Sequence, residues 1–184
     1  MQDDNNELFI QQYRSSIGLF ATGVTVLIAE QDGDIRGMTA NAITSLSLEP
    51  VQLIVCIAKQ ARFSKFIKPG THFTVNILGV HQETISNYFA SPDSDRAMAK
   101  NIDMIPWRNT ALSTPYKAPC LNDSVASFAC CVKQIHEGGD HWIVVADVLD
   151  VYQNELSPQP LLYFGGSYHH PSEMQRQHLK PPVY

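Results

Sequence analysis

The residues best suited to hold a polar ligand lie together between positions 37 and 48, where the sequence reads G-M-T-A-N-A-I-T-S-L-S-L. Small side chains let a ligand approach the backbone closely, and hydroxyl and amide groups can then hydrogen-bond to a polar head group. The alternative is a plain loop between two strands, since clusters of Ser, Thr and Asn usually indicate one. On spacing alone, the loop is the better interpretation.

Two cations follow the apolar segment that ends at Ala58. Lys59 leaves that segment, and Arg62 begins a short helix expected over residues 62–68. A cation beside the free N–H groups of a helix start suits a phosphate group by charge and by hydrogen bonding. The alternative, that both side chains are simply solvated, is the commoner outcome for a lone pair of cations and stays open.

A Gly-Gly-Asp-His turn over residues 138–141 is the third candidate. Asp140 can raise the proton affinity of His141, and the two glycines would let a planar ligand come close. The alternative is a surface turn in which Asp140 only shapes the backbone. The residues alone favour the turn.

Several other kinds of site are not indicated. The chain has no Gly-x-Ser-x-Gly, no Gly-x-Gly-x-x-Gly and no phosphate loop ending in Gly-Lys-Ser/Thr, and its cysteines and histidines lack metal-site spacing. A net charge of −5 argues against nucleic-acid binding. There is no run of about 18 apolar residues to cross a membrane and no signal-peptide pattern. We therefore expect a cytoplasmic protein with reduced thiols.

Strands must position these candidates. Apolar residues at Phe9, Tyr13, Ile17 and Phe20 predict a helix over 5–20, which Asn5 or Asn6 could cap. Asp-Gly at 32–33 predicts a hairpin. The expected strands are 24–29, 35–40, 51–58, 72–78, 125–135, 141–152 and 161–164, with a further helix over 82–89. Six or seven strands with hairpin-like connections predict a mainly β antiparallel barrel with peripheral α-helices in one domain, with a core over about 9–168 and a polar tail over 169–184.

Eight segments, in this order, resemble the flavin reductase-like family of FMN-binding split barrels. They are F-A-T-G-V-T-V at 20–26, G-M-T-A-N-A at 37–42, T-S-L-S-L-E-P at 44–50, V-C-I-A-K at 55–59, F-T-V-N-I-L at 73–78, Q-E-T-I-S-N-Y-F-A at 82–90, G-G-D-H at 138–141 and P-L-L-Y-F-G-G-S-Y at 160–168. Each segment is weak evidence alone, but eight in order over most of the chain are strong evidence.

The resemblance implies a six-stranded Greek-key split barrel and a homodimer with a flavin, FMN or FAD, near the dimer interface. It implies hydride transfer from NADH or NADPH to the flavin, which is then supplied to a partner flavin-dependent monooxygenase. A non-catalytic carrier or sensor that only binds FMN is the alternative. Only the enzyme requires the Gly-Asp-His turn to face the flavin.

The resemblance also assigns residues. It places His141 beside the nicotinamide, where it holds the ring without transferring a proton, because the flavin carries the hydride chemistry. This chain has Ala42 where the family usually has Ser. The residues expected to contact the cofactor are Met38, Thr39, Ala40, Asn41, Ala42, Ser45, Leu46, Ser47, Cys56, Ile57, Ala58, Lys59, Arg62, Phe89, Arg96, Asp140 and Tyr168.

Overall fold

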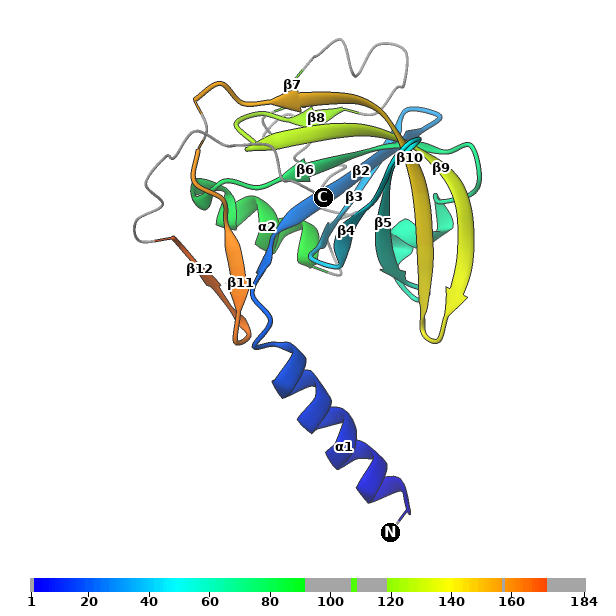
Figure 1. Ribbon diagram of the computed structural model, residues 1–184, viewed down its shortest axis with the longest axis vertical. Coiled ribbons are helices and arrows are strands. Elements are labelled where there is room, and N and C mark those ends of the chain that lie inside the picture. Colours follow the sequence, from blue (N-terminus) through cyan, green and yellow to red (C-terminus); the bar gives the residue numbers. More distant parts are fainter. Residues whose placement is uncertain (1, 92–106, 109–118, 157, 172–184) are drawn as a thin grey trace.

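The computed structural model of the chain describes residues 2–91, 107–108, 119–156 and 158–171 (Figure 1). Its helices are α1 (Gln2–Ile17), α2 (Glu83–Ala90) and two short 3-10 helices, η1 (Arg62–Lys65) and η2 (Val80–Gln82). Its strands are β1 (Thr22–Gly23), β2 (Thr25–Gln31), β3 (Asp34–Ala40), β4 (Ile43–Leu48), β5 (Val51–Ala58), β6 (His72–Ile77), β7 (Trp107–Arg108), β8 (Cys120–Leu121), β9 (Ala126–Gly138), β10 (His141–Gln153), β11 (Leu162–Phe164) and β12 (Ser167–His169).

The central sheet has the strand order β3-β2-β6-β9-β10-β5-β4, and every neighbouring pair is antiparallel. Apolar side chains from β2, β3, β5, β6, β9 and β10 meet in one buried cluster, so the sheet curls around a single core. The expected mainly β antiparallel barrel with peripheral helices is thereby confirmed. β4 is the seventh strand of this sheet and was not among the expected strands, whereas the strand expected over 161–164 forms β11 in a separate three-stranded sheet.

Strand β2 is buried on both faces, which explains its uninterrupted apolar sequence. Leu27 and Ala29 point into the barrel core. Val26 and Ile28 belong to a second buried cluster on the outer face, which α2 and the β11–β12 hairpin cover. The predicted hairpin also forms, because Asp32 and Gly33 adopt positive φ angles of 55° and 82° between β2 and β3.

Asn76 on β6 is a polar residue at 0% exposure. Its amide donates to the Val26 carbonyl and to Thr74 Oγ1, each at 3.1 Å. Its carbonyl oxygen accepts from the Leu121 N–H at 3.0 Å and from Ser127 Oγ at 2.9 Å. One buried amide therefore joins β2, β6, β8 and β9 with its hydrogen-bonding capacity used.

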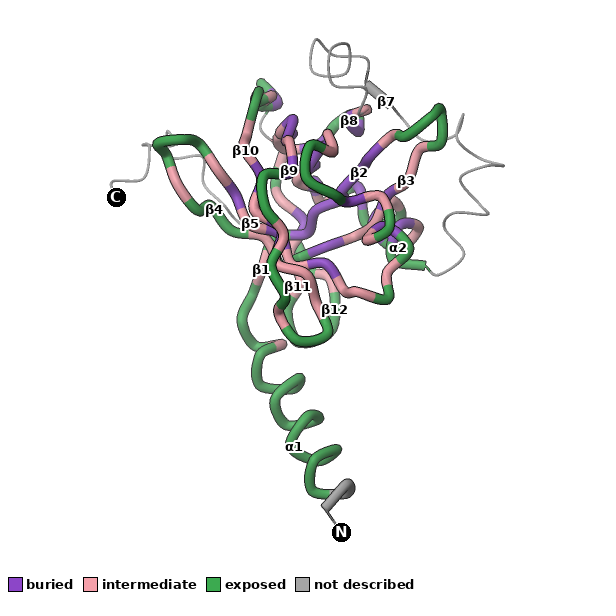
Figure 2. The backbone as a smooth tube through the Cα atoms, turned by 90° about the vertical axis from the view of Figure 1, so that its right-hand side faces the viewer, coloured by how far each residue is buried: buried purple, intermediate pink, exposed green. Residues whose placement is uncertain are grey.

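Helix α1 projects away from the barrel (Figures 1 and 2). The predicted helix forms, but the capping expectation for Asn5 and Asn6 is wrong, because α1 begins at Gln2 and both residues lie inside it. From Asn5 to Ile17 every side chain is exposed, including Phe9 at 66% and Tyr13 at 60%. Neither α1 nor α2 combines the length and apolarity that a membrane span requires.

Candidate functional site

Backbone pairing brings three of the predicted segments together. The Cys56 N–H donates to the Ala42 carbonyl at 2.9 Å. Ala58 is the Cα partner of His141 on β10, and the Lys59 N–H donates to the Asp140 carbonyl at 2.9 Å. The residues just before β4, the end of β5 and the β9–β10 turn therefore lie side by side at one end of the sheet, here called the site edge, although they are far apart in the sequence.

The central stretch is mostly strand. Only Asn41 and Ala42 lie outside β3 and β4, so the loop interpretation of the whole stretch is wrong. β4 is the last strand of the central sheet and pairs with β5 on one side. Alternate backbone N–H and C=O groups of β4 therefore point away from the sheet on its other side. The side chains of Asn41, Ala42, Ser45 and Leu46 are exposed, and that of Ser47 is half-buried.

A second group of predicted residues gathers around α2, on the outer face of the barrel. Thr39 Oγ1 donates to the Ser86 carbonyl at 2.6 Å. Ser86 Oγ and the Tyr168 hydroxyl share a hydrogen bond of 2.7 Å, and the Tyr168 ring packs edge-on against Tyr163 at 5.5 Å between centroids. Asn41 connects this group to the first, since its amide donates to Thr22 Oγ1 at 3.2 Å on the strand paired with β11.

Three of the predicted contact residues are buried, and a fourth is half-buried. Ala40, Ile57 and Phe89 are at 8%, 0% and 3% exposure, and the half-buried Met38 packs against the barrel core. Phe89 sits over Gly37, where an added Cβ would come within 2.6 Å of Phe89 Cδ1. In this chain their side chains support the site by packing, and their contact with a flavin remains a prediction.

The predicted cations are close to the β9–β10 hairpin. Lys59 Nζ lies 3.2 Å from Glu137 Oε1 and 4.6 Å from the centroid of the Trp142 ring. Arg62 is exposed at the start of η1. The helix expected over 62–68 is a 3-10 helix of four residues, so the cations themselves must supply most of the attraction for a phosphate.

The electrostatics at the hairpin turn concern Asp140 and His141. Asp140 Oδ1 lies 2.7 Å from His141 Nδ1, and the histidine side chain is 44% exposed. The hydrogen bond to His141, followed by the imidazole charge, lowers the pKa of Asp140 below its ordinary value. When Nδ1–H donates to the carboxylate, Nε2 is left available to a ligand.

The predicted contact residue Arg96 lies outside the described residues.

The sequence analysis missed Ser86, whose buried side chain and carbonyl bind Tyr168 and Thr39. A signal existed, because Ser86 is a polar residue on the apolar side of the predicted 82–89 helix. A polar side chain in that position needs a hydrogen-bond partner.

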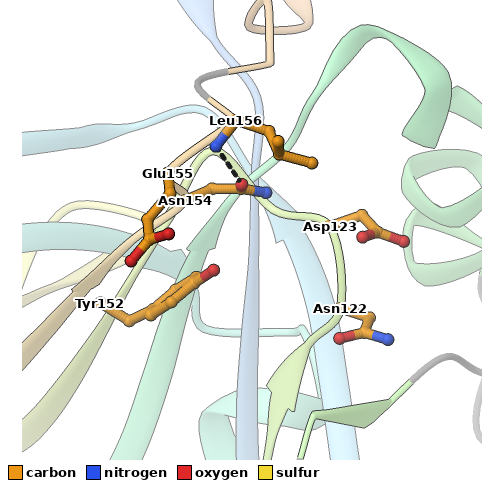
Figure 3. Close-up of a pocket in the computed structure, with 6 residues that line it drawn as sticks. All are labelled: Asn122, Asp123, Tyr152, Asn154, Glu155 and Leu156. Carbon is orange, nitrogen blue, oxygen red and sulfur yellow. Dashed lines mark hydrogen bonds between the residues drawn. The ribbon is translucent and has the colours of Figure 1, made fainter.

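A cavity of ≈ 390 Å³ lies away from these residues, near the start of β9 and the end of β10 (Figure 3). None of the predicted site residues lines it. Within it the Leu156 N–H donates to Asn154 Oδ1 at 3.0 Å. Its lining residues are Asn122, Asp123, Tyr152, Asn154, Glu155 and Leu156.

Comparison with known families decides the identity. The model of the family described as flavin reductase like domain matches residues 17–172. The chain belongs to this family. The match includes every predicted site residue and leaves most of α1 outside.

Relatives agree over most of their length. The chain is 32% identical over 159 residues to the reductase component of 4-nitrophenol 4-monooxygenase/4-nitrocatechol 2-monooxygenase from Rhodococcus opacus, covering 86% of this chain and 80% of the relative. It is 36% identical to the NADH-dependent flavin reductase StyB from Pseudomonas fluorescens, and the match covers 85% of this chain and 87% of the relative. Among solved structures, the NADH:FAD oxidoreductase SgcE6 of Streptomyces globisporus, in complex with NAD and FAD fragments, aligns with a TM-score of 0.75 at 31% identity over 86% of this chain and 90% of that one.

The residues present fit a flavin. The exposed Asn41 and Ala42 lie just before β4, and the exposed Ser45 lies on it; all three offer small or hydrogen-bonding side chains beside β5. Outward backbone N–H groups on the free side of β4 suit the carbonyl and ring nitrogen where a reduced flavin carries negative charge. Lys59 follows the end of β5 at the site edge, where its ammonium lies over the Trp142 ring, and His141 on β10 pairs with Ala58. This surface can hold a planar polar ring and one phosphate.

Proposed function

We propose that the protein is an NADH-dependent flavin reductase that supplies reduced flavin to a partner flavin-dependent monooxygenase. The observation that carries the proposal is the site edge, which joins Ala42, Cys56, Ala58 and His141 through backbone pairing. The site edge brings together the two requirements of the reaction, small and hydroxylated groups to hold a flavin and a residue that can meet the nicotinamide. A flavin held there would supply the hydride-accepting chemistry, and the residues of the chain would supply position and electrostatics.

Each group on the edge has a defined task in this proposal. The β4 backbone and the Ser45 hydroxyl hold the flavin ring, and Lys59 attracts the phosphate that FMN and FAD share. Asp140 orients His141 so that Nε2 meets the nicotinamide or its amide and keeps the ring at transfer distance. None of these steps requires a side chain to donate or accept a proton.

NADH is the proposed co-substrate, because StyB is described as an NADH-dependent flavin reductase and SgcE6 as an NADH:FAD oxidoreductase. We propose FMN as the preferred flavin, since the edge offers groups for one ring and one phosphate. The exposed apolar side chains of α1 and of the β4–β5 edge support a homodimer.

Anaerobic mixing of the protein, FMN and NADH in a stopped-flow spectrometer tests the activity. We expect the visible flavin absorbance to bleach many times faster than it does without protein. FAD and riboflavin in place of FMN, and NADPH in place of NADH, measure the two preferences. Quenching of flavin fluorescence on binding without bleaching by either nucleotide would instead identify the FMN carrier or sensor.

A further inference from the structure

The Lys59 ammonium is held between two side chains of one hairpin. Glu137 and Trp142 are direct Cα partners on β9 and β10, so their side chains leave the same face of the sheet. Lys59 Nζ lies 3.2 Å from Glu137 Oε1 and 4.6 Å from the Trp142 ring centroid. The cation thus has a carboxylate partner and an aromatic partner before any nucleotide binds.

The two partners differ in how firmly they are fixed. Trp142 packs against the barrel core and is half-buried. The Glu137 side chain is 76% exposed, whereas that of Lys59 is 33% exposed. An ion pair with an exposed carboxylate is weak, because water and salt screen it and the side chain loses freedom on pairing. Glu137 can therefore be displaced while Trp142 still holds the cation.

We propose that Glu137 is a specificity-determining residue that competes with the phosphate of a bound nucleotide for Lys59. The inference rests on the proposed function and deepens it. A phosphate must displace the carboxylate before it can pair with Lys59, so Glu137 weakens the binding of phosphorylated ligands and leaves riboflavin unaffected. Trp142 keeps the ammonium on the site during the exchange. A protein that passes its reduced flavin to another enzyme benefits, because the flavin remains releasable.

The test measures dissociation constants of FMN and riboflavin by quenching of flavin fluorescence. The proteins are the wild type, Glu137→Gln, Lys59→Met and the double variant. Removing the competing carboxylate should tighten FMN binding by about twofold to fivefold, the range expected for one exposed ion pair, with riboflavin unchanged. Lys59→Met should weaken FMN binding, and Glu137→Gln should then have no further effect.

Asp147→Asn is the matched control. It removes one negative charge from the same strand pair and breaks the Asp147–Lys133 ion pair of 3.6 Å. Asp147 lies five positions beyond Trp142, about 16 Å along β10, which exceeds the Debye length of about 8 Å at physiological salt. FMN affinity should therefore not change.

A second experiment distinguishes whether Glu137 competes with the phosphate of the flavin or with that of the dinucleotide. The KM for NADH is measured with riboflavin as acceptor, so that the dinucleotide alone carries phosphate. A lower KM in Glu137→Gln assigns the competition to the dinucleotide, and a changed FMN-to-riboflavin affinity ratio assigns it to the flavin. The proposal would be overturned if Glu137→Gln changed neither the flavin dissociation constants nor the KM for NADH. It would also be overturned if Glu137→Gln tightened FMN binding in the Lys59→Met background. Failure of the wild type to oxidise NADH would instead count against the proposed function, because the binding arm needs no turnover.

Discussion

At the scale of single residues, Asp140 determines which atom of the His141 ring remains available. The carboxylate lies 2.7 Å from Nδ1, and its pKa is lowered chiefly by the hydrogen bond to His141. A lowered carboxyl pKa means that the contact is complete at neutral pH and is lost as pH falls through that value. The orientation of the imidazole is therefore maintained throughout the neutral range.

Replacing His141 by Ala should slow flavin reduction by NADH by about tenfold to a hundredfold, because hydride transfer depends steeply on geometry. FMN affinity should stay nearly constant, since the proposed contact is with the nicotinamide. Transient kinetics at saturating FMN measure the rate and its NADH dependence. His136→Ala is the matched control, because His136 is also exposed on the hairpin but contacts Gln134. Equal kinetics in the two variants would remove the nicotinamide role of His141.

The thiols of β9 should differ from ordinary cysteines. Burial, followed by the neighbouring Cys131 and Cys120, raises the pKa of Cys130 far above its ordinary value of 9.0. Only the thiolate reacts readily, so iodoacetamide at pH 8 should leave Cys130 unlabelled in the native protein and label it after unfolding. Fragmentation mass spectrometry of the 130–131 peptide distinguishes the two adjacent sites. Rapid native labelling of Cys130 would contradict its burial at 0% exposure.

The same shift predicts how stability depends on pH. The pKa of Cys130 is higher in the folded protein than in the unfolded chain, so its contribution to stability is complete at pH values below the unfolded pKa. This contribution is lost as pH rises above about 9, where the unfolded chain ionises first. The free energy of unfolding in urea should therefore fall at alkaline pH, and Cys130→Ala should reduce that dependence.

At the scale of elements, α2 depends on a close approach to β3. Phe89 covers Gly37, and an added Cβ would come within 2.6 Å of the ring. Two hydrogen bonds at Ser86 hold the helix in the same place, because its carbonyl accepts from Thr39 Oγ1 and its hydroxyl pairs with that of Tyr168. The sequence could show that Gly37 begins the unusual stretch, but it could not show that a distant Phe requires a glycine there.

Gly37→Ala should lower the free energy of unfolding by about 1–3 kcal/mol, since the methyl group must push Phe89 or β3 aside. Urea unfolding followed by circular dichroism measures the change. Gly23→Ala serves as control, because a Cβ there meets nothing within 4 Å and its φ is not positive. Similar stability of the two variants would show that α2 shifts without cost.

The elements that could be predicted are those whose periodicity is strong. The long β9 and β10, the Asp32-Gly33 turn and α2 follow from apolar pattern and turn chemistry. β4 was not predicted, because its Ile-Thr-Ser-Leu-Ser-Leu sequence follows a stretch of small polar residues and its leucines stay exposed, and within the described residues β5 is the strand that pairs with it. The pairing of Ala58 with His141 is a tertiary register that no local pattern encodes. Family resemblance supplied that part of the site.

At the scale of the whole molecule, the distribution of exposed apolar side chains predicts assembly. Phe9, Ile10, Tyr13 and Ile17 lie on one face of α1 and are 40% to 66% exposed. Leu46, Leu48 and Val51 on the β4–β5 edge are exposed as well. Burial of such surface is favourable by roughly 25 cal/mol per Å², and isolated helices of this length are marginal in water. A second copy of the chain would cover both surfaces and stabilise α1.

The protein should therefore elute as a dimer in size-exclusion chromatography with light scattering, and charges on the apolar face of α1 should dissociate it. The variant Phe9→Glu/Tyr13→Glu places two carboxylates where we expect the partner to pack, and should give a monomer at micromolar concentration. The control Gln11→Glu/Ser15→Glu adds the same charge on the opposite side of the helix, because residues two positions apart lie about 200° apart around the axis. The control should remain a dimer. α1 lies almost entirely before the segment that matches the family. If the first variant is a monomer and the circular dichroism of its barrel is retained, then α1, and not the barrel alone, holds the two copies together. A dimer that persists in both variants would assign the interface to the β4–β5 edge instead.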